Sequence, residues 1–224
     1  MNPDELEKLP TNVQDVYNAV YVEVGMLRRK LATYYELYIE DPKHPDKVEI
    51  MNEMAGDFFG LCQIVLSNDI TMNIARLRDP SESLGYQNIS LEKLCNLFDT
   101  NAHRPLFVDL KIKLEKFREE SKSFNRIRNK KLGHLDSDTA FNVSKEPLPG
   151  FIPLSAKNSL KAAEAIINKI SLHFTGIATS KHVARPPGNA GTLLRHLRRA
   201  KSLKDKDSFY YTSTRKSLSL TKNK

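Results

Sequence analysis

Apolar residues recur every three or four positions along most of this 224-residue chain, and no segment alternates apolar and polar residues for long enough to require a strand. The longest pattern begins at Thr11 and places one face of apolar side chains at Val13, Val16, Val20, Val24, Leu27, Leu31, Tyr34 and Tyr38. This spacing matches the repeat of an α-helix. The sequence therefore predicts an all-α protein.

Further helices follow from the same periodicity and from start and stop signals. We expect a helix from Asp46 to Asp79, a short helix capped by Ser90, a helix that begins at Arg104-Pro105, and a last one from Ser155 to Gly176. The second helix should bury a face made of Met51, Ala55, Phe58, Cys62, Val65, Asn73 or Ile74, and Leu77. Together these segments predict a helical bundle of four or five helices.

Positive charge is concentrated at the C-terminal end of the chain. Residues 181–224 hold twelve Lys or Arg against two Asp, a net of +10, so the total of +8 leaves −2 for residues 1–180. We therefore expect an all-α domain over residues 1–180 and a basic, partly disordered tail over 181–224, with a short helix near 192–200.

Several classes of protein are not expected from this sequence. It has no apolar run near the roughly 18 residues that a membrane-spanning helix needs, and its acidic first residues do not resemble an export signal, so we expect a cytoplasmic protein without membrane contact. Its two cysteines, Cys62 and Cys95, lie in apolar helical patterns and should be free, buried thiols. No residue spacing indicates a metal site or a cofactor.

One group of residues interrupts an apolar face and carries chemistry. The face made by Leu114, Phe117 and Phe124 continues four residues later at Arg128. Asn125 and Asn129 lie within one helical turn of Arg128, so the three side chains can form a polar cluster. His134 follows six residues after Arg128, directly after Gly133, where we expect the helix to unwind.

The segment 128–134 resembles the Arg/His motif of the HEPN superfamily of ribonucleases and defence toxins; its sequence is Arg128-Asn129-Lys130-Lys131-Leu132-Gly133-His134. The segments 74–80, 88–91 and 193–197 are similar to its abortive-infection, AbiU-like branch. The resemblance covers roughly residues 10–200 and implies a helical homodimer that cleaves RNA without metal. It also implies that Arg128 and His134 are catalytic, with Asn129 as their polar companion.

The implied chemistry suits these side chains. RNA cleavage without metal needs a base for the 2′-hydroxyl, an acid for the leaving 5′-oxygen, and positive charge at the phosphate. Imidazole can act as base or acid, and guanidinium matches phosphate oxygens. One chain offers one motif His, so we expect His134 and Arg128 of two chains to share a cleft and to leave 2′,3′-cyclic phosphate and 5′-hydroxyl ends.

One position departs from the pattern of paired toxin and nucleotidyltransferase systems. In those toxins the antitoxin modifies a Tyr two residues after the motif His, whereas Asp136 stands here. Asp136 either orients His134 or is an exposed loop residue. An antitoxin, if there is one, is then expected to act by another route, and an acidic protein is an alternative partner.

The tail offers a second candidate site. Six basic residues precede the aromatic run 209–211, a combination that suits phosphates and stacked bases: Arg195, Arg198, Arg199, Lys201, Lys204 and Lys206. The alternative is a solubilising tail. For the whole chain, the alternatives to an endoribonuclease are a non-catalytic HEPN-like module that binds RNA or a protein, and a structural scaffold in which Arg128 forms an ion pair.

Overall fold

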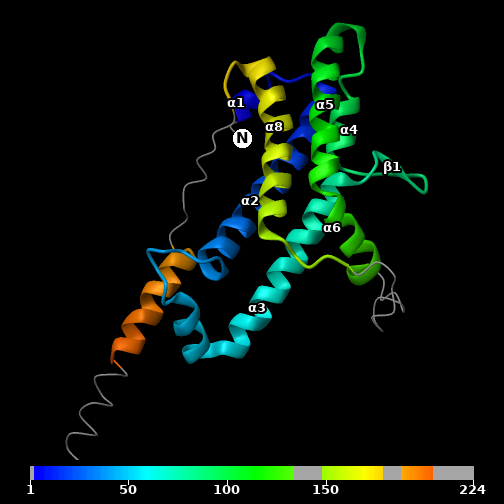
Figure 1. Ribbon diagram of the computed structural model, residues 1–224. Coiled ribbons are helices and arrows are strands. Elements are labelled where there is room, and N and C mark those ends of the chain that lie inside the picture. The colour runs from blue at the N-terminus through cyan, green and yellow to red at the C-terminus, as the bar shows by residue number, and fades with distance from the viewer. Residues whose placement is uncertain (1–2, 134–147, 179–187, 204–224) are drawn as a thin grey trace, which may run out of the picture. The chain divides into compact units, whose positions relative to one another are not determined.

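The structure is a computed structural model that describes residues 3–133, 148–178 and 188–203. The chain divides into two units, each treated separately below. The first unit contains residues 1–32 and 65–184, and the second contains residues 33–64 and 185–224. Figure 1 labels helices α1 to α6, helix α8 and strand β1, and draws the helix over 190–203 in orange.

The described residues are mostly helical and contain almost no strand, which confirms the all-α prediction. The helices are α1 (Pro3–Leu6), α2 (Thr11–Tyr38), α3 (Lys47–Arg78), α4 (Leu91–Asn96), α5 (Arg104–Glu120), α6 (Lys122–Ile127) and α8 (Pro153–Thr175), with a 3-10 turn η1 (Asn101–His103), a π-helical turn η2 (Arg128–Leu132) and a helix over 190–203. The only strands among these residues are β1 (Glu82–Ser83) and β2 (Tyr86–Gln87).

The first unit is built around α5, which packs against α8 and α4 (Figure 1). Pro105 lies in the first turn of α5, where its missing N–H group costs no hydrogen bond. The predicted apolar face of α5 is buried at Leu106, Leu110, Leu114 and Phe117. Helix α2 joins this core through the fully buried Tyr17, whose hydroxyl donates to the Ile167 carbonyl at 3.4 Å.

A short antiparallel hairpin, with two residues in each strand, connects α3 to α4. Strands β1 and β2 pair Glu82 with Gln87 and Ser83 with Tyr86. Leu84 and Gly85, between the strands, have φ values of 51° and 80°, the combination of positive angles that a tight hairpin turn requires. The hairpin is fully exposed on both strands. Sequence periodicity could not indicate it, because each strand has only two residues.

The second unit has a small apolar core of its own. Leu37, Met51 and Phe59 pack with Ala190 and Leu194 of the 190–203 helix. Tyr38 packs against this core and donates from its hydroxyl to the Phe59 carbonyl at 3.0 Å, while burial raises the pKa of Tyr38 to about 12.

The buried face of α3 differs from the expected one in its first half. Ala55 has a non-helical backbone (φ −166°, ψ 60°), which kinks α3 and shifts the helical register after it. As a result Phe59 is buried, whereas Phe58 and Val65 are 59% and 57% exposed. The expectation of two buried thiols is wrong for Cys62, which is half-buried, and confirmed for Cys95.

The ends of the helices agree closely with the predicted signals. Ser90 caps α4 by accepting a hydrogen bond from the Lys93 N–H at 3.2 Å. Gly176 ends α8 in the left-handed conformation, with φ of 70°. The segment after α5 is interrupted at Ser121, whose hydroxyl donates to the Phe117 carbonyl at 2.6 Å. None of the helices described here combines the length and apolar character needed to cross a membrane.

Candidate functional site

The backbone around Arg128 is a single π-helical turn. The Gly133 N–H donates to the Arg128 carbonyl at 2.6 Å, one residue further along than in an α-helix. Gly133 is the residue that caps this turn, and it keeps right-handed helical angles (φ −84°, ψ −34°). Whether the chain unwinds after it, as expected, lies outside the described residues. A Cβ at this position would lie 3.2 Å from the Arg128 carbonyl oxygen, closer than ordinary van der Waals contact. Turns of this kind often occur at functional sites.

Two partners hold the guanidinium of Arg128. Its Nη1 lies 2.5 Å from Oδ1 of Asp79, and its Nε donates to Oδ1 of Asn129 at 3.0 Å. The side chains of Arg128 and Asp79 are 23% and 24% exposed. The expected neighbourhood of Arg128 and Asn129 is therefore present. Among the described residues, Asn125 contributes no side-chain hydrogen bond to Arg128.

Arg78 lies near both Arg118 and Arg128. Arg78 donates from Nε to the Arg118 carbonyl at 3.4 Å. Burial lowers the pKa of Arg78, and the nearby positive charges of Arg118 and Arg128 lower it further. Burial also acts to lower the pKa of Arg118, but hydrogen bonds from Arg118 to Glu115 and Glu92 outweigh it and raise that pKa.

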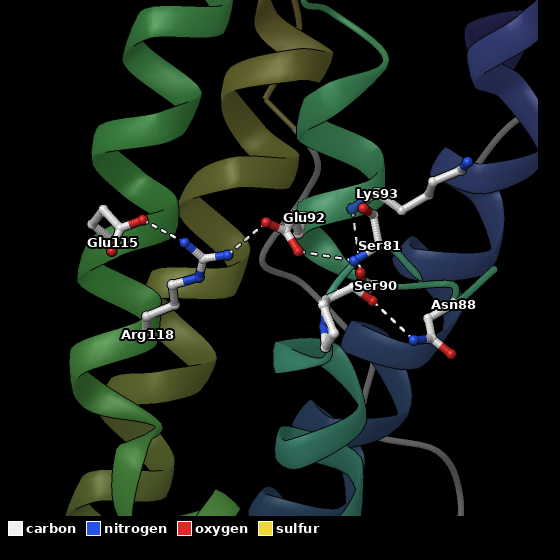
Figure 2. Close-up of polar contacts among 8 residues, drawn as sticks. Ser81, Asn88, Ser90, Glu92, Lys93, Glu115 and Arg118 are labelled. Carbon is white, nitrogen blue, oxygen red and sulfur yellow. Dashed lines mark hydrogen bonds and ion pairs between the residues drawn. The ribbon is translucent and has the colours of Figure 1, made fainter. Parts of the chain in front are cut away.

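The segment between α3 and α4 carries a connected set of polar contacts, drawn in Figure 2. Glu92 of α4 lies between two donors: its Oε1 accepts from Nη2 of Arg118 at 2.7 Å, and its Oε2 accepts from the Ser81 N–H at 2.8 Å. Arg118 also pairs with Glu115 at 2.6 Å. These contacts join α4 and α5 to the residues that follow Asp79.

Sequence reasoning did not assign a role to Arg78, Asp79 or Arg118. Asp79 is 49 positions from Arg128, and only its place before Pro80, at the end of a predicted helix, distinguishes it in the sequence. The fold brings it to Arg128. The other candidate residue of the motif, His134, and its neighbour Asp136 lie outside the described residues.

In chemical terms, the site offers cationic hydrogen-bond donors beside carboxylates. A guanidinium held at two nitrogens can direct its remaining N–H groups at an anion such as a phosphate. In the parts of the chain that are described, no group of three or more His, Cys, Asp or Glu residues could hold a metal ion.

The basic residues predicted to bind nucleic acid fall into three groups. Arg198 makes a two-pronged contact with Asp46, at 2.9 and 2.8 Å, and Lys201 lies 2.8 Å from both Glu49 and Glu53. Arg195 and Arg199 are exposed, and Arg195 donates to the Thr192 hydroxyl at 3.1 Å. The remaining two residues lie outside the described residues: Lys204 and Lys206.

The hydrogen bond from Arg198 lowers the pKa of Asp46 and raises that of Arg198 itself. These ion pairs join the 190–203 helix to the start of α3 within the second unit. The carboxylates of Asp46, Glu49 and Glu53 offset the positive charge that Arg198 and Lys201 would present to a phosphate.

Comparison with known proteins gives a family. The HEPN-superfamily model described as AbiU2 matches residues 10–193, which is most of the chain and includes Asp79, Arg128 and the motif that ends at His134. No curated protein and no solved structure shows significant similarity to the chain. The long match, together with the helical architecture and the position of the Arg/His motif, shows that this chain belongs to the AbiU2 family of the HEPN superfamily.

Proposed function

We propose that the chain is a metal-independent endoribonuclease of the toxin or abortive-infection type. Membership of the AbiU2 family supports a module of this kind. The observation that carries the proposal furthest is the guanidinium of Arg128, which is partly exposed and held at two nitrogens by Asp79 and Asn129, six residues before His134.

In this proposal each side chain has one role. His134 takes the proton from the 2′-hydroxyl or returns one to the leaving 5′-oxygen. Arg128 stabilises the extra negative charge that develops on the phosphate oxygens. Asn129 holds the Nε side of Arg128. The products are a 2′,3′-cyclic phosphate and a 5′-hydroxyl.

The reaction needs a base and an acid at the same time, and the motif of one chain has one His. We therefore propose a homodimer in which two copies of Arg128 and His134 share one cleft. The exposed Arg195 and Arg199 supply charge for RNA, together with Lys204 and Lys206. Arg198 and Lys201 contribute less, because carboxylate partners offset their charge.

The direct test is cleavage of a mixed RNA pool by the purified chain in excess EDTA, with the ends identified by mass spectrometry. His134→Ala and Arg128→Ala should each remove cleavage while the variants remain folded and keep the same mass in solution. Matched controls are His173→Ala and Arg104→Ala, which remove an exposed imidazole and an exposed guanidinium elsewhere in the first unit. Both controls should cut like the wild type.

Two outcomes would change the assignment. If nothing is cut but RNA is bound with a steep salt dependence, the chain is a non-catalytic HEPN-like binding module. If both motif variants lose stability and the wild type neither cuts nor binds RNA, Arg128 serves the scaffold through its ion pair with Asp79.

A further inference from the structure

The guanidinium of Arg128 is restrained in a directional way. Asp79 holds Nη1 and Asn129 holds Nε, which face different sides of the planar group, so the two contacts restrain it from two directions. A guanidinium has five N–H donors, of which these contacts use two. Among the described residues, Nη2 has no hydrogen-bond partner. The free donors therefore point in a direction that the two contacts determine.

Asp79 is itself held by the backbone that follows it. The next residue, Pro80, accepts a hydrogen bond from Nδ2 of Asn88 at 2.9 Å, and the Ser81 carbonyl accepts from the Asn88 N–H at 2.9 Å. The Ser81 N–H donates to Glu92 at 2.8 Å. Three hydrogen bonds thus secure the two residues after Asp79.

Glu92 ties this segment to the helices. Its second oxygen accepts from Arg118 of α5 at 2.7 Å, and its side chain is only 18% exposed (Figure 2). The position of Asp79 is therefore set by α4 and α5 through Glu92, and not by Arg128 alone. A carboxylate placed in this way can impose an orientation on its arginine.

We propose that Asp79 is a positioning residue for Arg128: it fixes the guanidinium so that the free N–H groups meet the scissile phosphate. The inference rests on the proposed ribonuclease function and deepens it. Asp79 also offsets part of the charge of Arg128. Removing its charge should therefore leave RNA binding equal or tighter, while the chemical step becomes slower. A contact that only held the helices together would not separate binding from catalysis in this way.

The first test measures kcat and KM for RNA cleavage in Asp79→Asn and in Asp79→Glu. Because small misplacements of a catalytic group cost up to about 100-fold in rate, we expect Asp79→Asn to lower kcat about 10- to 100-fold with KM unchanged or lower. Asp79→Glu, which keeps the charge, should recover part of the loss. Asp109→Asn is the matched control, since Asp109 also pairs with basic side chains on the first unit, Lys113 and Lys169.

A double-mutant cycle separates positioning from an independent effect. If Asp79 acts through Arg128, Asp79→Asn should cost nothing further in an Arg128→Lys background, because lysine cannot keep the fork geometry. A wild-type kcat in Asp79→Asn, or a full additional loss in the double variant, overturns the proposal.

A second readout does not depend on RNA cleavage. Nitrogen-15 NMR of the arginine side chains follows rotation of the Arg128 guanidinium about its Nε–Cζ bond. Rotation should be slow in the wild type and in Asp109→Asn, and at least several-fold faster in Asp79→Asn. Equal rotation rates in all three proteins overturn the proposal even if the wild type cuts no RNA. A faster rate in a chain that cuts nothing supports the restraint by Asp79 and refutes the ribonuclease function instead.

Discussion

Glu92→Gln is the substitution that most sharply tests how the segment between α3 and α4 is held. The carboxylate accepts one charge-assisted hydrogen bond from Arg118 at 2.7 Å and one backbone hydrogen bond from the Ser81 N–H at 2.8 Å. A glutamine side chain has the same shape but one acceptor oxygen, so its NH2 group must face one of these two donors. One donor is then left without its partner.

The size of the effect follows from burial. Glu92 is 18% exposed and Arg118 is 29% exposed, so water replaces the lost acceptor only in part. Leaving one partly buried donor unsatisfied costs about 1–3 kcal/mol. For a chain of this length each kcal/mol lowers Tm by about 2–4 °C, so we expect Tm to fall by about 2–12 °C.

The assay combines thermal and urea unfolding with hydrogen exchange at the Ser81 amide. Glu92→Gln should lower the free energy of unfolding and speed exchange of that amide. The control is Glu119→Gln on α5, the same chemical change at an exposed carboxylate, which should stay within about 0.5 kcal/mol of the wild type. If the two variants have equal stability and the Ser81 amide keeps its protection, Glu92 does not secure this segment.

Three further predictions concern other parts of the structure. A thiol reagent at pH 8 should label the half-buried Cys62 first and Cys95 only on unfolding, because burial raises the pKa of Cys95 to about 12; equal labelling rates would contradict this. Gly176→Ala, at φ of 70°, should lower the free energy of unfolding by about 1 kcal/mol, whereas Gly25→Ala inside α2, where a new Cβ meets nothing within 4 Å, should raise it by about 0.5–1 kcal/mol; urea titrations that reverse this order would refute the argument. The hydrogen bond from Arg198 lowers the pKa of Asp46. The ion pair of Asp46 and Arg198 therefore stabilises the fold above the ordinary carboxyl pKa, and this stabilisation is lost as pH falls through the lowered pKa. The difference in free energy of unfolding between wild type and Asp46→Asn should be under about 1 kcal/mol, because the Asp46 side chain is 46% exposed. It should be present at neutral pH and disappear as pH falls below about 4, and a difference that persists in acid would count against this pair.

Helix positions followed directly from the sequence where local signals act. Ser90, Arg104-Pro105 and Gly176 mark helix ends in the structure as they do in the sequence, because caps and fixed backbone angles are local properties. The buried face of α3 could not be predicted in the same way. The kink at Ala55 has no proline to announce it, and it exchanges Phe58 for Phe59 in the core.

The candidate site shows the same division. The neighbourhood of Arg128 and Asn129 is a consequence of helical spacing and was predicted. The contact between Arg128 and the carboxylate of Asp79 depends on how α3 packs against the end of α6. No local sequence pattern indicates a contact between residues 49 positions apart. The ion pairs of Arg198 and Lys201 were missed for the same reason, since Asp46 and Glu49 lie some 150 positions away.

The π-helical turn at Arg128–Leu132 also determines how the motif tolerates changes in length. Its i to i+5 hydrogen bond accommodates one residue more than an α-helical turn. A chain with one residue fewer between Arg128 and Gly133 can close the same carbonyl with an ordinary α-helical bond and keep the axis of the helix. A chain with one residue fewer inside a regular α-helix would instead rotate everything that follows by about 100°. A one-residue deletion within this turn should therefore disturb the axis of the helix less than the same deletion within α5.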